Sequence, residues 1–300
     1  MLQILALVCL LVAAPAAWAA ESSGSPDPRR EEARQRYNAG LAALQRRELD
    51  YALYQFRQAI RLQPDMVEAH HNLGVALLEL RQPTAAQEAF RHALELVPDH
   101  TESRVGLGLA YRANGELSRA IEELTATLPK KGSDPQISLV LGDLYRRTKQ
   151  PQKAVDHFRQ AVRLAPEDAA AHFQLGLAYA DAGDIDQTLD ALRAGLRLKP
   201  DDADAHYNLG LMVDRKIRVL VDEKVAAYQR AVQMQPNLAD AYYQLGVAYI
   251  QKARLSRVEE KRALLQLALE QFRVFQLHAP QDPRAPVAAQ NIEALELQVK

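Results

Sequence analysis

The chain has 300 residues, of which 48% are hydrophobic and 25% are charged, and its formal net charge is −1. These values indicate a folded protein of one elongated or two compact domains. Because 37 basic residues balance 38 acidic ones and are dispersed along the chain, the composition excludes a basic nucleic-acid-binding protein.

The N-terminal stretch resembles an export signal. Residues 1–20 carry no charged side chain and are followed by the polar run ESSGSPDPRR. An apolar core from Leu2 to Val12 precedes Ala17-Trp18-Ala19, the A-x-A pattern of a signal-peptidase site. We therefore expect a signal peptide over residues 1–19, cleaved after Ala19. The alternative is an uncleaved membrane anchor, since about 20 apolar residues can span a bilayer.

The only cysteine, Cys9, lies inside this segment. Val8 precedes it where a lipoprotein needs a small residue, so we expect no lipidation. The mature chain then contains no cysteine, which excludes disulfides, cysteine zinc sites and a thiol nucleophile. Residues 20–32 begin with a Ser-, Gly- and Pro-rich run and predict a flexible linker.

A periodic series of glycines organises the rest of the chain. Seven of the 13 glycines are spaced by 34 residues five times and then by 36. We name them the repeat glycines: Gly40, Gly74, Gly108, Gly142, Gly176, Gly210 and Gly246. Other residue types keep the same register, among them Ala52, Ala86, Ala120 and Ala154, then Phe56, Phe90, Leu124 and Phe158. A proline closes most units, and L-G-x2-Y occurs at 107–111, 141–145, 175–179 and 245–249.

This pattern resembles the tetratricopeptide repeat (TPR) family, whose 34-residue unit reads W-x2-L-G-x2-Y, A-x3-F, P. The resemblance covers residues 33–283 in seven units: 33–66, 67–100, 101–134, 135–168, 169–202, 203–238 and 239–282. It implies an all-α fold, a right-handed α-solenoid (superhelix) in which each unit is a hairpin of a first and a second helix. Stacked neighbours then bury a continuous core.

Several units depart from the family pattern. The third reads TLPKKGSD at 127–134, so we expect its second helix to end early. The sixth carries about two extra residues within DRKIRVLVDEK (214–224), and the seventh about ten within KARLSRVEEKRALLQ (252–266), which predicts lengthened helices. Thr188 and Lys224 replace the mid-repeat alanine and should loosen packing locally.

Residues 284–300 predict a helix that caps the solenoid. Pro286 falls in its first turn, where proline is favoured. One face carries the apolar side chains, Ala288, Ile292, Leu295 and Val299.

Catalytic motifs are missing from the sequence: there is no Walker motif, no H-E-x-x-H and no G-x-S-x-G. We therefore expect no enzyme, no cofactor and no metal. His70, His172 and His206 recur in the column where the family has tryptophan, which favours a structural role over a metal site.

Three columns on one side of each first helix form a candidate binding face. They comprise the residues three before, two before and one after each repeat glycine. The candidates are Tyr37, His71, Phe173, Tyr207 and Tyr243; Asn38, Asn72, Gln174, Asn208 and Gln244; Leu41, Val75, Leu177, Leu211 and Val247; and the central Arg112 and Arg146.

This side is similar to the concave wall of TPR proteins, where extended peptides or partner helices bind. The amide column is similar to the asparagine ladder of O-linked N-acetylglucosamine transferase, because an amide pairs with a peptide backbone of any sequence. Two alternatives remain open. The apolar columns can simply pack against the next first helix, and the amides can order neighbouring helices.

The resemblance thus implies a non-catalytic scaffold that binds a protein or peptide partner in the concave TPR groove. If the source is bacterial, the signal peptide predicts the periplasm or cell envelope, where such proteins typically assist assembly or secretion machinery. The alternatives are a self-assembling structural homo-oligomer and a membrane-anchored adaptor in a membrane-associated complex. We expect no nucleic-acid partner.

Overall fold

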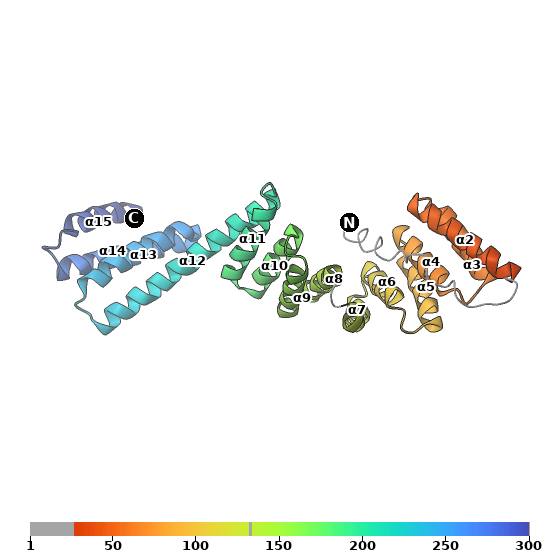
Figure 1. Cartoon of the computed structure of the whole chain (residues 1–300). Coiled ribbons are helices and arrows are strands. Elements are labelled where there is room, and N and C mark those ends of the chain that lie inside the picture. Colours follow the sequence, from red (N-terminus) through yellow and green to blue (C-terminus); the bar gives the residue numbers. More distant parts are fainter. Residues whose placement is uncertain (1–26, 132–133, 300) are drawn as a thin grey trace. The chain divides into compact units, whose positions relative to one another are not determined.

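The computed structural model describes residues 27–131 and 134–299 (Figure 1), and within these ranges every regular element is an α-helix. The expected signal peptide, residues 1–19, and the first part of the expected linker lie outside the described residues. The chain divides into two compact units: unit 1 ends at Asp201 and unit 2 begins at Asp202. In the described ranges, no helix is long and apolar enough to cross a bilayer.

Unit 1 is a stack of hairpins that follows the predicted period. Each first helix packs against its own second helix, and each second helix packs against the next first helix. This is the predicted all-α solenoid (Figure 1). Its helices are α2 (Pro28–Gln45), α3 (Leu49–Leu62), α4 (Val67–Glu79), α5 (Pro83–Leu96), α6 (Thr101–Ala113), α7 (Leu117–Lys131), α8 (Pro135–Arg147), α9 (Pro151–Leu164), α10 (Ala169–Ala182) and α11 (Ile185–Leu198).

The repeat glycine lets the two helices of each hairpin approach closely. A Cβ added to Gly142 would lie 2.7 Å from the ring of Phe158, sixteen residues later in the second helix. The glycine costs about 1 kcal/mol of helix propensity, which this packing offsets. The same contact recurs in the other hairpins of the unit: Gly40 with Phe56, Gly74 with Phe90, Gly108 with Leu124, and Gly176 with Leu192.

The turn inside each hairpin depends on one residue with positive φ. It stands seven positions after the repeat glycine, where it ends the first helix in the left-handed region. The following residue then donates its N–H to the carbonyl five positions earlier, as Gln82 does to Leu77 at 2.9 Å. The positive-φ residues are Arg47, Arg81, Gly115, Lys149 and Gly183.

In three repeats of unit 1, the column predicted to hold structural histidines joins the first helix to the end of the preceding repeat. Its side chains hydrogen-bond the carbonyl oxygen of the repeat-closing proline six residues earlier. These pairs are His70 with Pro64 and His172 with Pro166, both at 2.9 Å, and Arg104 with Pro98 at 2.8 Å.

Two predicted boundaries in unit 1 are wrong. The linker was expected to reach residue 32, but α2 begins at Pro28, because Asp27 caps it and proline suits the first helical position. The second helix of the third repeat does not end early: α7 has 15 residues and reaches Lys131. Its buried Ala120, Leu124 and Thr127 keep the helical spacing.

Unit 2 contains α12 (Ala203–Met234), α13 (Ala239–Leu255), α14 (Val258–His278) and α15 (Ala285–Val299). The predicted hairpin of the sixth repeat is wrong, because α12 is one continuous helix of 32 residues. Seven positions after Gly210 stands Ile217, a β-branched residue that strongly disfavours positive φ. Residues 211–235 also contain no Gly, Pro or Asn, the residues that most often end a helix.

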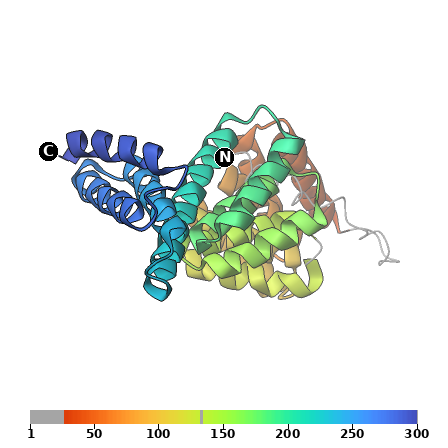
Figure 2. The same cartoon turned by 90° about the vertical axis from the view of Figure 1, so that its left-hand side faces the viewer.

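The seventh repeat and the cap follow the sequence prediction. The extra residues lengthen α13 to 17 and α14 to 21 residues, with a short turn at Ser256 and Arg257. Helix α15 lies beside α14, as Figures 1 and 2 both show, and buries Ala288 and Leu295. The capping helix is therefore confirmed.

Candidate partner-binding surface

The candidate binding face is closed in the second repeat. His71, Asn72 and Val75 are all 0% exposed, so their prediction as partner contacts is wrong. The physical reason is that α4 lies between two other first helices, α2 and α6, which cover its sides. His71 uses this position to contact Ser103 of α6, with Nδ1 3.1 Å from Oγ.

The amide of Asn72 joins neighbouring helices rather than facing a groove. Its Nδ2 donates to the hydroxyl of Tyr37 in α2 at 3.0 Å and to the carbonyl of Glu68 at 2.9 Å. Burial raises the pKa of Tyr37 to about 12, and the negative charge of Glu68 adds to this, while the Asn72 hydrogen bond lowers it. At this position the helix-ordering alternative for the amide column holds.

The face is accessible at the two ends of unit 1. On α2, Asn38 is exposed, and Tyr37 and Leu41 are half-buried. On α10, the three candidates Phe173, Gln174 and Leu177 are half-buried. The ring of Phe173 lies against Gly195 of α11, so part of its surface belongs to the hairpin core.

Between these ends lies a charged group that we name the arginine row: Arg112, Arg146 and Arg147, with the carboxylates of Asp143 and Asp181. Arg146 Nε donates to Asp181 Oδ2 at 2.7 Å, and its Nη1 lies 3.4 Å from the amide oxygen of Gln174. Arg147 Nε is 3.0 Å from Asp143 Oδ2. Three guanidinium groups face two carboxylates, so the arginine row keeps one positive charge.

Arg112 is a half-buried member of the arginine row. Burial lowers the pKa of its guanidinium, Asp143 opposes that shift, and the like charge of Arg147 adds to it. A partly desolvated cation without full compensation favours an anionic group that approaches it. Of the two predicted central residues, Arg112 therefore interacts with Asp143 and Arg147 of α8, and Arg146 of the same helix pairs with Asp181.

The candidates in unit 2 differ strongly from one another. On α12, Tyr207 is 68% and Leu211 44% exposed, whereas Asn208 is half-buried. On α13, Gln244 and Val247 are half-buried. Tyr243 is also half-buried. Its ring packs edge-on against Phe272 and Phe275, and the Arg284 guanidinium lies 5.0 Å from its centroid.

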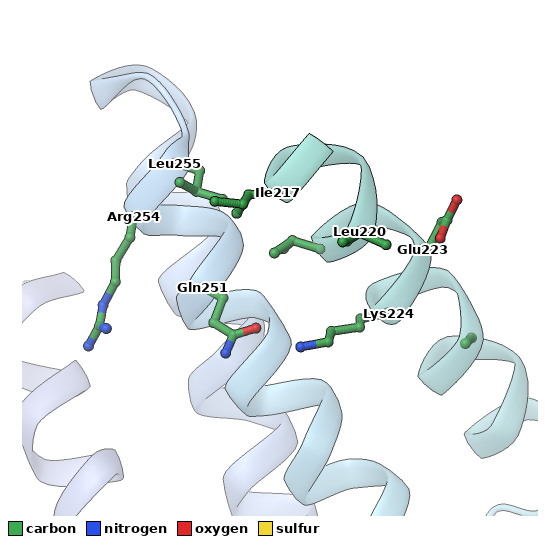
Figure 3. Close-up of a pocket in the computed structure, with 9 residues that line it drawn as sticks. Ile217, Leu220, Glu223, Lys224, Gln251, Arg254 and Leu255 are labelled. Carbon is green, nitrogen blue, oxygen red and sulfur yellow. The ribbon is translucent and has the colours of Figure 1, made fainter. Parts of the chain in front are cut away.

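The sequence did not predict a hollow that lies between α12 and α13 (Figure 3). It has a volume of about 670 Å³. Figure 3 shows Ile217 and Leu255 meeting at one end and Lys224 extending toward Gln251. The lining residues are Ile217, Leu220, Val221, Glu223, Lys224, Ala227, Gln251, Arg254 and Leu255. The one sequence signal for this hollow was Ile217 in the place of a turn residue.

In the described ranges, no three His, Cys, Asp or Glu side chains gather around a common point.

Family models match most of the repeat region. One described as "Tetratricopeptide repeat" matches residues 71–136, and one described as "TPR repeat" matches residues 40–80, 142–183, 178–213 and 222–252. The matches leave out residues 214–221, the middle of α12. A comparison with curated proteins gave no match.

Solved structures similar to this chain include MamA proteins. One, titled "Crystal structure of MamA protein", is 21% identical with a TM-score of 0.54, covering 58% of this chain and 95% of that one. MamA from Desulfovibrio magneticus RS-1 is 22% identical with a TM-score of 0.55, covering 58% and 98%. The pilF structure of Pseudomonas aeruginosa is 14% identical with a TM-score of 0.51, covering 91% and 100%. At these identities the likeness concerns the fold alone.

Proposed function

The chain belongs to the tetratricopeptide repeat family, and from this premise we propose that it binds a peptide or helix of a partner protein on the first helices of unit 1. Its repeats make it a protein–protein interaction scaffold, and proteins of this family are generally non-catalytic. The surface proposed here is the arginine row together with Phe173, Gln174 and Leu177.

The observation that carries the proposal is the partly desolvated Arg112, which senses the charges of Asp143 and Arg147 on α8, the helix that also carries Arg146. A carboxylate that reaches this group forms charge-assisted hydrogen bonds, which are about twice as strong as neutral ones. On the adjacent α10, Phe173 and Leu177 keep part of their apolar surface accessible. The partner segment that fits this surface carries an acidic side chain close to one or two apolar ones.

A peptide selection tests this proposal. Random peptides are selected on the immobilised protein, and the affinity of the enriched peptides is measured by calorimetry. We expect acidic-apolar peptides to be enriched and to bind at least about tenfold more weakly to Arg112→Ala with Arg146→Ala, since each lost charged hydrogen bond costs about 1.5–3 kcal/mol. Arg193→Ala, an exposed arginine of α11, is the matched control and should bind normally. Equal affinity of the double variant would refute the arginine row as the binding surface.

We further propose that the protein is exported and works in the periplasm or cell envelope, aiding an assembly or secretion machinery. The support is the A-x-A pattern Ala17-Trp18-Ala19 that follows the apolar core from Leu2 to Val12. N-terminal sequencing of the protein from its native cells tests the cleavage, and the expected first residue is Ala20. If the native chain still begins at Met1, the anchored-adaptor alternative is favoured instead.

A further inference from the structure

Gly210 differs from the other repeat glycines because nothing lies within 4 Å of the place where its Cβ would be. The residue that should cover it is Tyr228, which stands in the A-x3-F register after Lys224, eighteen positions beyond Gly210. In the straight helix α12, eighteen residues span about 27 Å. Gly210 and Tyr228 of one chain are therefore held far apart.

The second half of α12 nevertheless keeps the contacts of a normal second helix. Val221 and Val225 are buried, and Gln229 Nε2 donates to the hydroxyl of Tyr249 in α13 at 2.8 Å. Arg159 makes the equivalent bond to Tyr179 at 2.6 Å between successive repeats of unit 1. What the sixth repeat lacks is contact between its two halves, and in the first half Tyr207 and Leu211 are exposed.

The hollow of Figure 3 lies where the first helix of this repeat would pack. In unit 1 a first helix such as α4 packs against its own second helix, α5, and beside the next first helix, α6. The corresponding neighbours here are the second half of α12 and α13. These are the two helices that line the hollow.

We infer that the hollow receives the first half of α12 from a second copy of this chain. The two α12 helices run antiparallel, with Gly210 of each against Tyr228 of the other. A single stripe along the helix carries residues at spacings of three or four: Gly210, Asp214, Ile217, Val221, Lys224 and Tyr228. The glycine–tyrosine register then sets Asp214 level with Lys224 and Ile217 level with Val221 of the partner copy.

Charge complementarity selects this arrangement. In the antiparallel register the stripe brings Asp214 toward Lys224 of the other copy twice, once on each side of the two-fold axis, and Arg215 lies level with Glu223. A parallel pair would set like charges level with one another, which is unfavourable. Closing a hairpin within one chain would require Ile217, which stands at the turn position seven after Gly210, to adopt positive φ, and a β-branched residue strongly disfavours that conformation.

Charge reversal tests the dimer. Sedimentation of the purified protein over a range of concentrations should show twice the 33.5 kDa chain mass. Lys224→Asp or Asp214→Lys should weaken dimerisation at least about tenfold, and combining the two should restore it, because the pair is then re-formed with exchanged signs. The matched control is Arg230→Asp, two residues beyond Tyr228 and so on the opposite side of α12, which should leave the mass unchanged.

A disulfide cross-link tests the register and shows whether the contact forms between two chains or within one. Gly210→Cys with Tyr228→Cys, in a Cys9→Ala background, should give a dimer on a non-reducing gel after oxidation. A disulfide within one chain would show instead that the hairpin closes in the monomer, which overturns the inference. A monomer at every concentration, or a dimer indifferent to Lys224→Asp, overturns it equally. Both measurements use the protein alone and leave the arginine row intact, so their outcome is independent of the proposed peptide binding.

Discussion

A repeat glycine and the large side chain sixteen residues later set the distance between the helices of each hairpin in unit 1. At the same residue scale, a single phenol and a single amide link the first two repeats. Tyr37 of α2 accepts a hydrogen bond from Asn72 of α4, and Asn72 is buried while Tyr37 is half-buried. Side chains that the sequence predicts as part of a binding face therefore hold neighbouring helices together.

Tyr37 makes the stability of the fold sensitive to alkaline pH. An unfolded tyrosine loses its proton near pH 10, whereas burial raises the pKa of folded Tyr37 to about 12. Between these values the folded state holds more protons, so the free energy of unfolding falls as pH rises and this contribution is intact below pH 10. Urea unfolding at pH 9 and pH 11 should show a smaller loss for Tyr37→Phe than for the wild type. Tyr51→Phe, at an exposed tyrosine of α3, should behave as the wild type, and an equal loss in all three proteins would contradict the assignment.

At the scale of the element, the position seven after each repeat glycine decides whether a repeat becomes a hairpin or one helix. Glycine or a long polar residue there accepts the left-handed conformation, as Gly183 and Lys149 do. Isoleucine does not, and α12 runs straight through Ile217. One side chain in the turn thus changes the topology of a whole repeat.

Relieving the turn conformation should stabilise unit 1. Lys149 has a φ of 57°, and the left-handed region costs a residue with a Cβ about 1–2 kcal/mol. Part of this gain is offset, because glycine has more conformational freedom in the unfolded chain. We therefore expect Lys149→Gly to raise the free energy of unfolding by about 0.5–1 kcal/mol in urea titrations. The complementary variant Gly183→Ala, at a φ of 83°, should lower it by about 1 kcal/mol. Destabilisation by Lys149→Gly would show that the turn is not strained.

At the scale of the whole molecule, each helix contacts mainly its neighbours in sequence, as expected for a solenoid. Stability is then a sum of local terms, and damage at one end stays local. The cap α15 ends the stack of unit 2 by covering α14, with Leu295 only 3% exposed.

Displacing the capping helix α15 should therefore unfold the C-terminal end of unit 2 and leave unit 1 folded. Leu295→Asp removes a buried leucine, worth about 2–5 kcal/mol, and introduces a charge into its place. Hydrogen exchange should show lost protection in α15 and on the covered side of α14, while α4 to α9 of unit 1 keep theirs. Leu297→Asp, two residues along but 72% exposed, is the control and should change nothing. Loss of protection throughout unit 1 would show that the molecule unfolds as one cooperative body.

Much of this molecule was predictable because its pattern is local. The 34-residue period, the glycine contacts, the lengthened helices of the seventh repeat and the cap with Ala288 and Leu295 each depend on spacing within one or two neighbouring helices. Periodicity along the sequence records such spacing directly. Of the candidate site, Arg112, Arg146, Phe173, Gln174 and Leu177 keep accessible surface, and their role in binding stays a prediction.

Other features were decided only by the tertiary structure. His71, Asn72 and Val75 stand in the same columns as accessible residues, yet they are buried because first helices flank α4 on both sides. The hollow beside Lys224 lies between α12 and α13. It exists because α12 continues through Ile217 and does not turn there. By itself, the sequence determined which helices form and where most of them end, because backbone preference and apolar spacing are local. Which helix faces stay accessible to a partner depends on the helices packed beside them. Residues of one column in the repeat pattern look alike in the sequence even where these neighbours differ.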